Sequence, residues 1–136
     1  MQSNDDFNDE IIKLSNMRLL KAKKDLESAK LLLDNGLVTQ SINRSYYSIF
    51  HSVRALLAYD RFDSKKHSGI IAYFNQNYIK SGKIDKKYSE ILMYAWSTRD
   101  KSDYDDFYNS TKDEAEIHIK NAEDFINRIK EYINLI

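Results

Sequence analysis

Two clusters of polar side chains interrupt the apolar helical patterns of this chain. Residues 43–47 read Asn-Arg-Ser-Tyr-Tyr and are followed by His51 and Arg54, whereas residues 99–104 read Arg-Asp-Lys-Ser-Asp-Tyr. Arginine, histidine and tyrosine are costly to bring near a core unless they are paired or used. A guanidinium group matches two phosphate oxygens at once, and histidine transfers protons near neutral pH. We therefore expect the two clusters to form one shared site.

The second cluster supplies the group on which this expectation depends. Arg99 lies four residues beyond Ala95 on one helical line, so it points toward the interior of a bundle. There Arg99 would hold a phosphate, Tyr104 would donate a hydrogen bond or stack on a base, and Asp103 would orient Arg99. The alternative for Arg99 is a structural salt bridge to Asp103 or to an acid of the last helix.

The first cluster forms a line along one helix face. Arg44, Tyr47, His51 and Arg54 follow one another at steps of three or four residues. We expect Arg44, Tyr47 and His51 to line the same cleft as Arg99. The alternative for His51 is a bond to a neighbouring tyrosine or carboxylate. We interpret His67 as a loop residue next to a helix N-terminus.

Composition excludes several classes of protein. The chain has 136 residues with three glycines and no proline, which favours long helices over sheets. It has no cysteine, so disulfides and thiolate metal sites are impossible. The acidic residues at 100–106 lack the glycine and the terminal glutamate of a calcium loop. No glycine-rich phosphate loop is present either, and we predict neither a metal site nor a cofactor.

Charge and hydropathy indicate where in the cell the protein would be found. The formal net charge is zero, so no global field attracts nucleic acid. The first residues are polar and acidic, and no apolar stretch reaches the length of a membrane span. We predict a soluble cytoplasmic protein with a single domain over residues 1–136, in which residues 1–8 form a loose tail.

Apolar periodicity places the two clusters on an all-α fold. Residues recurring at steps of three, four and seven predict helices over about 9–34 and 38–59, a shorter helix over about 68–79, and long helices from about 85 and from about 110. Asn35-Gly36 ends the first helix, and Ser110-Thr111 offers a cap for the last. The result is an up-and-down bundle of four long helices plus one short helix, with a loop at 103–109.

The chain resembles the HEPN domain family over about residues 18–132. The resemblance rests on residues 43–51, on Lys66-His67-Ser68-Gly69, on Ser81-Gly82-Lys83 and on residues 99–104, in this order and spacing. The pattern is most similar to the HEPN subfamily found beside minimal nucleotidyltransferases, often as toxin–antitoxin pairs. The resemblance implies a helical bundle that forms a homodimer, whose fourth helices build a composite cleft.

One departure from the family pattern affects the expected chemistry. The resemblance implies that active HEPN ribonucleases use an arginine followed four to six residues later by a histidine, without a metal. Here Tyr104 stands where that histidine is expected after Arg99. Tyrosine has a reference pKa of about 10, against about 6.5 for histidine, and is a poor base at neutral pH.

Three functions follow. The first is a homodimeric module that binds a nucleotide or RNA phosphate at a cleft lined by Arg99, Asp103, Tyr104, Arg44, Tyr47 and His51. It would work with a separate minimal nucleotidyltransferase, for which the Tyr104 hydroxyl is a conceivable acceptor by the resemblance. The second is a metal-independent ribonuclease toxin that uses Arg99 with His51 or Tyr104. The third is a non-catalytic dimeric interaction module.

Overall fold

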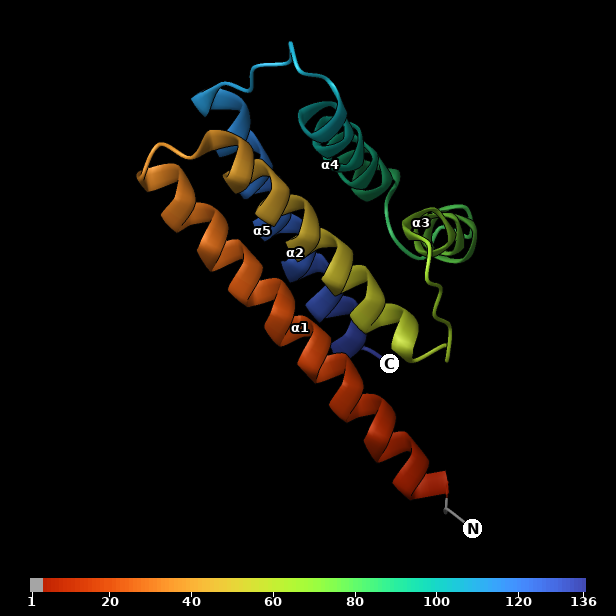
Figure 1. Ribbon diagram of the computed structural model, residues 1–136. Coiled ribbons are helices and arrows are strands. Elements are labelled where there is room, and N and C mark those ends of the chain that lie inside the picture. The colour runs from red at the N-terminus through yellow and green to blue at the C-terminus, as the bar shows by residue number, and fades with distance from the viewer. Residues whose placement is uncertain (1–3) are drawn as a thin grey trace.

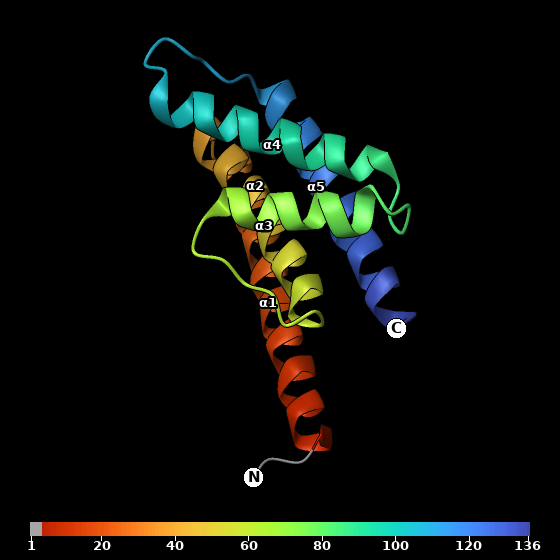
Figure 2. The ribbon, with the colours of Figure 1, turned by 90° about the vertical axis from the view of Figure 1, so that its right-hand side faces the viewer.

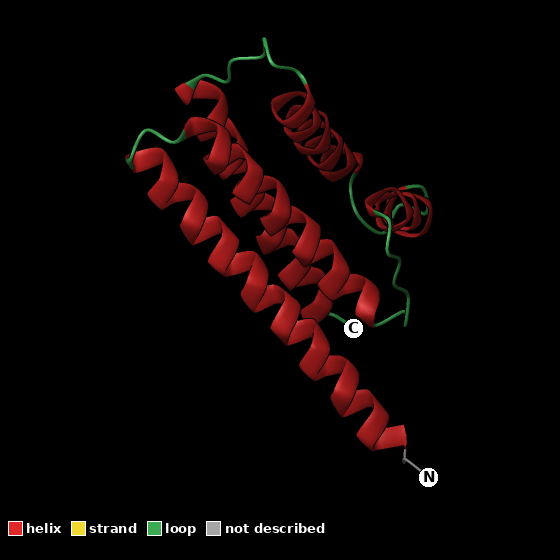
Figure 3. Cartoon of the chain, viewed as in Figure 1, coloured by secondary structure: helices red, strands yellow, loops and turns green. Residues whose placement is uncertain are grey.

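Helices and the connections between them make up residues 4–136, which are the residues described in this computed structural model. The elements are α1 (Asn4–Asp34), α2 (Val38–Ala58), α3 (His67–Phe74), the π-helical turn η1 (Asn75–Ile79), α4 (Lys86–Tyr104) and α5 (Lys112–Asn134). No strand occurs among these residues (Figure 3). The predicted all-α bundle of four long helices and one short helix is confirmed.

Two layers meet at α2. Helices α1, α2 and α5 lie side by side, and α3 and α4 cover the other side of α2 (Figure 1). In the second view α3 runs across the direction of α1 and α2 (Figure 2). The core lies between these layers, and α2 contributes more of its buried side chains than any other helix, including Tyr46, Ile49 and Leu56. Helix α2 is therefore the element from which a side chain can reach either layer.

Small residues let α1 and α2 pack closely. Ala22 and Ala29 on α1 are fully buried, as is Ser41 on α2. The Ser41 hydroxyl donates to the Ala29 carbonyl over 2.7 Å, and the Ser15 hydroxyl donates to the Ala55 carbonyl over 2.8 Å. Each bond satisfies a buried hydroxyl, so the seam between the helices contains polar groups without leaving them unpaired.

The helix ends largely follow the sequence signals. Thr111 caps α5 by accepting a hydrogen bond from the Glu114 amide, as predicted, and Asp85 caps α4 by accepting one from the Lys87 amide. Helix α4 continues to Tyr104, which lies past the expected start of the loop at 103. Its first core residues are Ile91, Leu92 and Ala95, and Arg99 continues that line.

Helix α1 differs from expectation at its start. It begins at Asn4 and not near residue 9, because Asp5 and Asp6 in the first turn complement the positive end of the helix. Part of the tail expected at 1–8 is therefore helical, and residues 1–3 lie outside the described residues. This end of α1 extends past the end of α2 (Figure 1). Ile12 fits the apolar period of residues 9–34 but is 44% exposed, whereas Ser15, Arg18 and Ala22 are buried.

Candidate functional site

The two polar clusters meet where α4 crosses α2. The Cζ atom of Arg99 lies 5.6 Å from the ring centroid of Tyr46 and 5.7 Å from that of Tyr47. Its Nη2 also donates to the Tyr47 hydroxyl over 3.3 Å. The cation is therefore held against two aromatic rings, an arrangement that is favourable where water is partly excluded.

Asp103 fixes the other side of the Arg99 guanidinium. Nε of Arg99 lies 3.1 Å from Oδ2 of Asp103, close enough for an ion pair although the N–H is not aligned for a hydrogen bond. Oδ1 of Asp103 accepts a bond from Asn43 of the first cluster, over 3.4 Å. Asp103 thus lies where it can orient Arg99. The same contact is the salt bridge that the sequence left open as the alternative.

Asp25 of α1 lies beside both Arg44 and His51 of the α2 line. Nη1 of Arg44 lies 3.2 Å from one oxygen of Asp25, and Nε2 of His51 lies 3.6 Å from the other. Burial lowers the pKa of His51, and the Asp25 carboxylate opposes that shift in part. The sequence named a neighbouring carboxylate as one alternative for His51, but it gave no sign that α1 would supply it.

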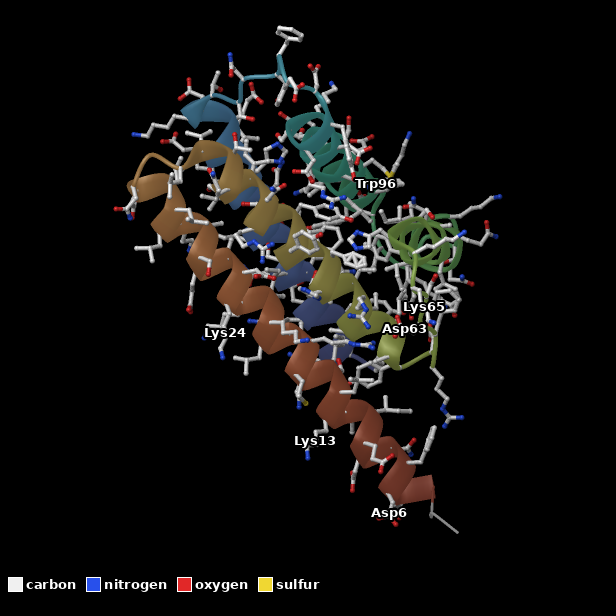
Figure 4. The ribbon with its side chains drawn as sticks, in the orientation of Figure 1. Asp6, Lys13, Lys24, Asp63, Lys65 and Trp96 are labelled. Carbon is white, nitrogen blue, oxygen red and sulfur yellow. The ribbon has the colours of Figure 1, made fainter. Side chains whose placement is uncertain are left out.

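A groove of about 590 Å³ opens beside Tyr47, between α2 and the connection to α3. Its walls are aromatic and basic side chains with one carboxylate: Tyr47, Phe50, His51, Arg54, Asp63, Ser64, Lys65 and His67. Asp63 and Lys65 lie on the connection between α2 and α3 (Figure 4). Bases stack on aromatic rings and phosphates pair with cations, so this groove has the chemistry of a site for a nucleotide or single-stranded RNA.

Arg54 is partly neutralised at one end of this groove. Its Nη2 donates to Oδ2 of Asp63 over 3.0 Å, and Arg18 donates to the same oxygen over 3.3 Å. Burial alone would raise the pKa of Asp63, but the Arg54 and Ser64 hydrogen bonds and the nearby guanidinium charges lower it below its usual value. Asp63 therefore stays ionised beside two arginines, and this cluster keeps a net positive charge.

His67, which the sequence led us to interpret as a loop residue, is one of the groove residues. As the first residue of α3 it stacks on Phe50, with ring centroids 4.1 Å apart. Its Nδ1 lies 2.8 Å from the Tyr46 hydroxyl. The signal that could have found it is its place in Lys65-Lys66-His67, where the chain turns into a helix directly after two basic residues.

Tyr104 does not join Arg99 within this chain. It is the last residue of α4 and is 80% exposed. No hydrogen bond, ion pair or ring contact links it to Arg99 among residues 4–136. A role for Tyr104 beside Arg99 stays a prediction, and it would require a second molecule.

Two further features are absent from the described residues. Within residues 4–136 no group of three or more histidine, aspartate or glutamate side chains could hold a metal ion. No helix in that range combines the length and the apolar character that crossing a bilayer requires.

Comparison with known proteins gives the chain a family. The HEPN domain matches residues 15–132. Two Methanocaldococcus jannaschii proteins, named Putative toxin MJ0605 and Putative toxin MJ0142, are 37% and 34% identical to it. Those matches cover 85% and 83% of this chain and 85% and 77% of the relatives. A UPF0332 protein of Thermotoga maritima is 33% identical, over 83% of this chain and 86% of its own. The chain belongs to the HEPN domain family.

Proposed function

We propose that this HEPN protein binds the phosphate groups of a nucleotide or of RNA at the groove beside Tyr47, with Arg99 as the principal anchor. The observation that carries the proposal is the placement of Arg99. Its side chain is one-fifth exposed, and its guanidinium lies against Tyr47, which forms part of the groove wall. A ligand in the groove can then stack its base on aromatic rings and place its phosphate among Arg99, Arg54 and Lys65.

The charge balance of the chain indicates that a ligand would be attracted by local side chains and not by the net charge. The formal net charge of the whole chain is zero, so the affinity must come from the few cations at the groove. Binding to two or three phosphates would weaken with salt, with a slope of about −0.7 per phosphate for a single strand. A much steeper salt dependence would indicate a different and more extended surface.

Anisotropy of a short fluorescein-labelled single-stranded RNA tests the binding function. We expect Arg99→Ala to weaken binding at least about tenfold, because it removes a charge-assisted contact. Lys120→Ala is the matched control, since it removes one exposed positive charge from α5 outside the groove. Equal losses for the two variants, or no saturable binding by the wild type, would overturn the proposal.

We extend this proposal to a toxin that works with a minimal nucleotidyltransferase. The names of the two archaeal relatives support the toxin class. The exposed Tyr104 hydroxyl is open to a partner enzyme, and its oxygen would attack the α-phosphate of a nucleoside triphosphate as pyrophosphate leaves. Mass spectrometry after co-expression should find an added nucleotide on the wild type and on Tyr108→Phe, but none on Tyr104→Phe. Labelling of Tyr104→Phe at the wild-type level would reject this acceptor.

A homodimer is part of the same proposal. Three large apolar side chains on α4 and α5 are 40–49% exposed: Met93, Tyr94 and Ile117. Exposed apolar side chains that lie together favour contact with a partner molecule. Sedimentation should detect a dimer at micromolar concentration. A 16.1 kDa species alone would contradict the dimer.

Metal-independent ribonuclease activity is the second candidate. The groove contains His51, whose pKa burial lowers, so its imidazole is neutral near pH 7. A neutral imidazole with a free nitrogen can accept the proton of a ribose hydroxyl. RNA incubated with the protein and a chelator should be cleaved by the wild type and left intact by Arg99→Ala. Intact RNA with both proteins leaves the binding function as the sole activity.

A further inference from the structure

The His67 ring contacts three aromatic side chains. Its centroid lies 4.1 Å from that of Phe50 at an interplanar angle of 23°, and 5.8 Å from that of Tyr46 at the same angle. The Tyr47 ring meets it edge-on, at 5.8 Å and 86°. The imidazole is therefore held in one orientation at the groove wall, although it is only half-buried.

Tyr46 determines which nitrogen of His67 carries the proton. The Tyr46 side chain is fully buried, and its hydroxyl lies 2.8 Å from Nδ1 of His67. Burial raises the pKa of Tyr46, so the phenol keeps its proton. A buried hydroxyl needs an acceptor, and the unprotonated nitrogen of imidazole provides one. The hydroxyl donates to Nδ1, which leaves the proton of the neutral ring on Nε2.

The ring is also kept neutral by its surroundings. Burial lowers the pKa of His67, and the nearby Arg99 and Arg54 charges lower it further. A neutral imidazole with its proton on Nε2 is a hydrogen-bond donor on that side and has no lone pair there to act as a base. The two ring nitrogens point in widely different directions, so Nε2 faces away from the buried Tyr46 hydroxyl.

We propose that His67 is a phosphate-binding residue of this groove, which donates from Nε2–H to a ligand oxygen while Tyr46 fixes its tautomer. The inference rests on the proposed binding function and extends it to a residue on a third element, α3. The ligand class is the phosphate mono- or diester of a nucleotide or RNA strand. His67 would then hold a phosphate oxygen on the α3 side of the groove and Arg99 on the α4 side.

Nitrogen-15 spectra of the histidine rings test the tautomer directly. At pH 7 the His67 ring should be neutral with its proton on Nε2, and the Nε2 resonance should shift as the labelled RNA is added. Tyr46→Phe, which removes only one oxygen atom, should produce a mixture of tautomers and weaken RNA binding about two- to threefold. A proton on Nδ1 in the wild type would overturn the proposal.

Binding by two His67 variants separates this proposal from the function on which it rests. His67→Phe keeps the aromatic stacking and should weaken RNA binding about three- to tenfold, the range expected for one lost hydrogen bond. His67→Gln retains a donor near the position of Nε2 and should lose less. If His67→Phe binds RNA like the wild type while Arg99→Ala does not bind, His67 is no ligand residue and the groove function stands. If no protein binds RNA, both proposals fail.

Discussion

Arg99 on α4 donates a hydrogen bond to the Tyr47 hydroxyl on α2, across 3.3 Å and 52 residues of sequence. Tyr47 thus has two tasks, because its ring also lies under the Arg99 cation and forms part of the groove wall. This contact joins the two polar clusters that the sequence places on separate helices. It also holds the guanidinium against this wall residue before any ligand arrives, which would lower the entropy lost on binding.

Two substitutions of Tyr47 separate its tasks. Tyr47→Phe keeps the aromatic surface and loses the hydroxyl, so RNA affinity should fall about two- to fivefold. Tyr47→Ala removes the surface as well, and the loss should exceed tenfold because stacking contributes about 1–3 kcal/mol per base. Anisotropy titrations with the labelled RNA measure both. Equal affinities for Tyr47→Ala and the wild type would contradict a ligand in this groove.

Asp25 should control the protonation of His51. The carboxylate raises the pKa of His51 against the larger effect of burial, so Asp25→Asn should lower that pKa further. The variant should also lose about 1 kcal/mol or less of unfolding free energy, because the ion pair to Arg44 is partly exposed. A histidine NMR titration follows the pKa. Asp34→Asn serves as control, and an unchanged or raised His51 pKa in Asp25→Asn would be inconsistent with the observed contact.

Stability should fall in mild acid because all three histidines resist protonation in the folded chain. Burial lowers the pKa of His118, whose side chain is 1% exposed and whose Nε2 has no hydrogen-bond partner. Burial lowers those of His51 and His67 as well. The unfolded chain then binds more protons below about pH 6.5, so unfolding free energy decreases as pH drops through that value toward the folded pKa.

Replacing His118 should remove one part of this pH dependence. His118→Leu should flatten the decline below about pH 6.5 by up to about 1.4 kcal/mol per pH unit, the limit for one titrating group. Urea unfolding at a series of pH values gives the slope. A slope identical to that of the wild type would mean that His118 does not titrate differently in the folded and unfolded chains.

The seam between α1 and α2 should not tolerate a larger residue. Ser41→Val adds volume where Ala29 is fully buried and should cost about 1–3 kcal/mol of unfolding free energy. Ser41→Ala loses only the hydrogen bond and should cost about 1 kcal/mol. Ser81→Ala removes an exposed bond of the same kind, to the Asn77 carbonyl, and should change stability little. Denaturant unfolding ranks the three, and a neutral Ser41→Val would show that the seam is looser than described.

The helical periodicity predicted the parts of the site that depend on one helix alone. The line through Ala95 to Arg99, the α2 stripe of Arg44, Tyr47 and His51, and the Thr111 cap follow from spacing within a single element. Contacts between different helices could not be predicted from residue spacing. Asp25 is one of many charged residues on α1, and only the packing of α1 against α2 selects it as the partner of Arg44 and His51.

His67 and Ile12 show that local sequence does not determine which side chains the rest of the fold covers. His67 follows a connection whose path decides whether its ring reaches Tyr46 or water, and local sequence does not determine that path. Ile12 fits an apolar period of α1, yet it is 44% exposed while Ser15, Arg18 and Ala22 of the same helix are buried. Periodicity shows which residues share a helix face, but not which face the neighbouring helices cover.

Photocrosslinking tests the central claim, that the ligand lies in the groove beside Tyr47, most directly. A short single-stranded RNA that carries 4-thiouridine is bound, irradiated and digested, and the modified peptides are identified by mass spectrometry. We predict adducts on the peptides that contain Tyr47 and Phe50 or His67, and their loss in Arg99→Ala at the same RNA concentration. Adducts confined to the exposed aromatics Tyr94 and Phe107, unaffected by Arg99→Ala, would contradict it.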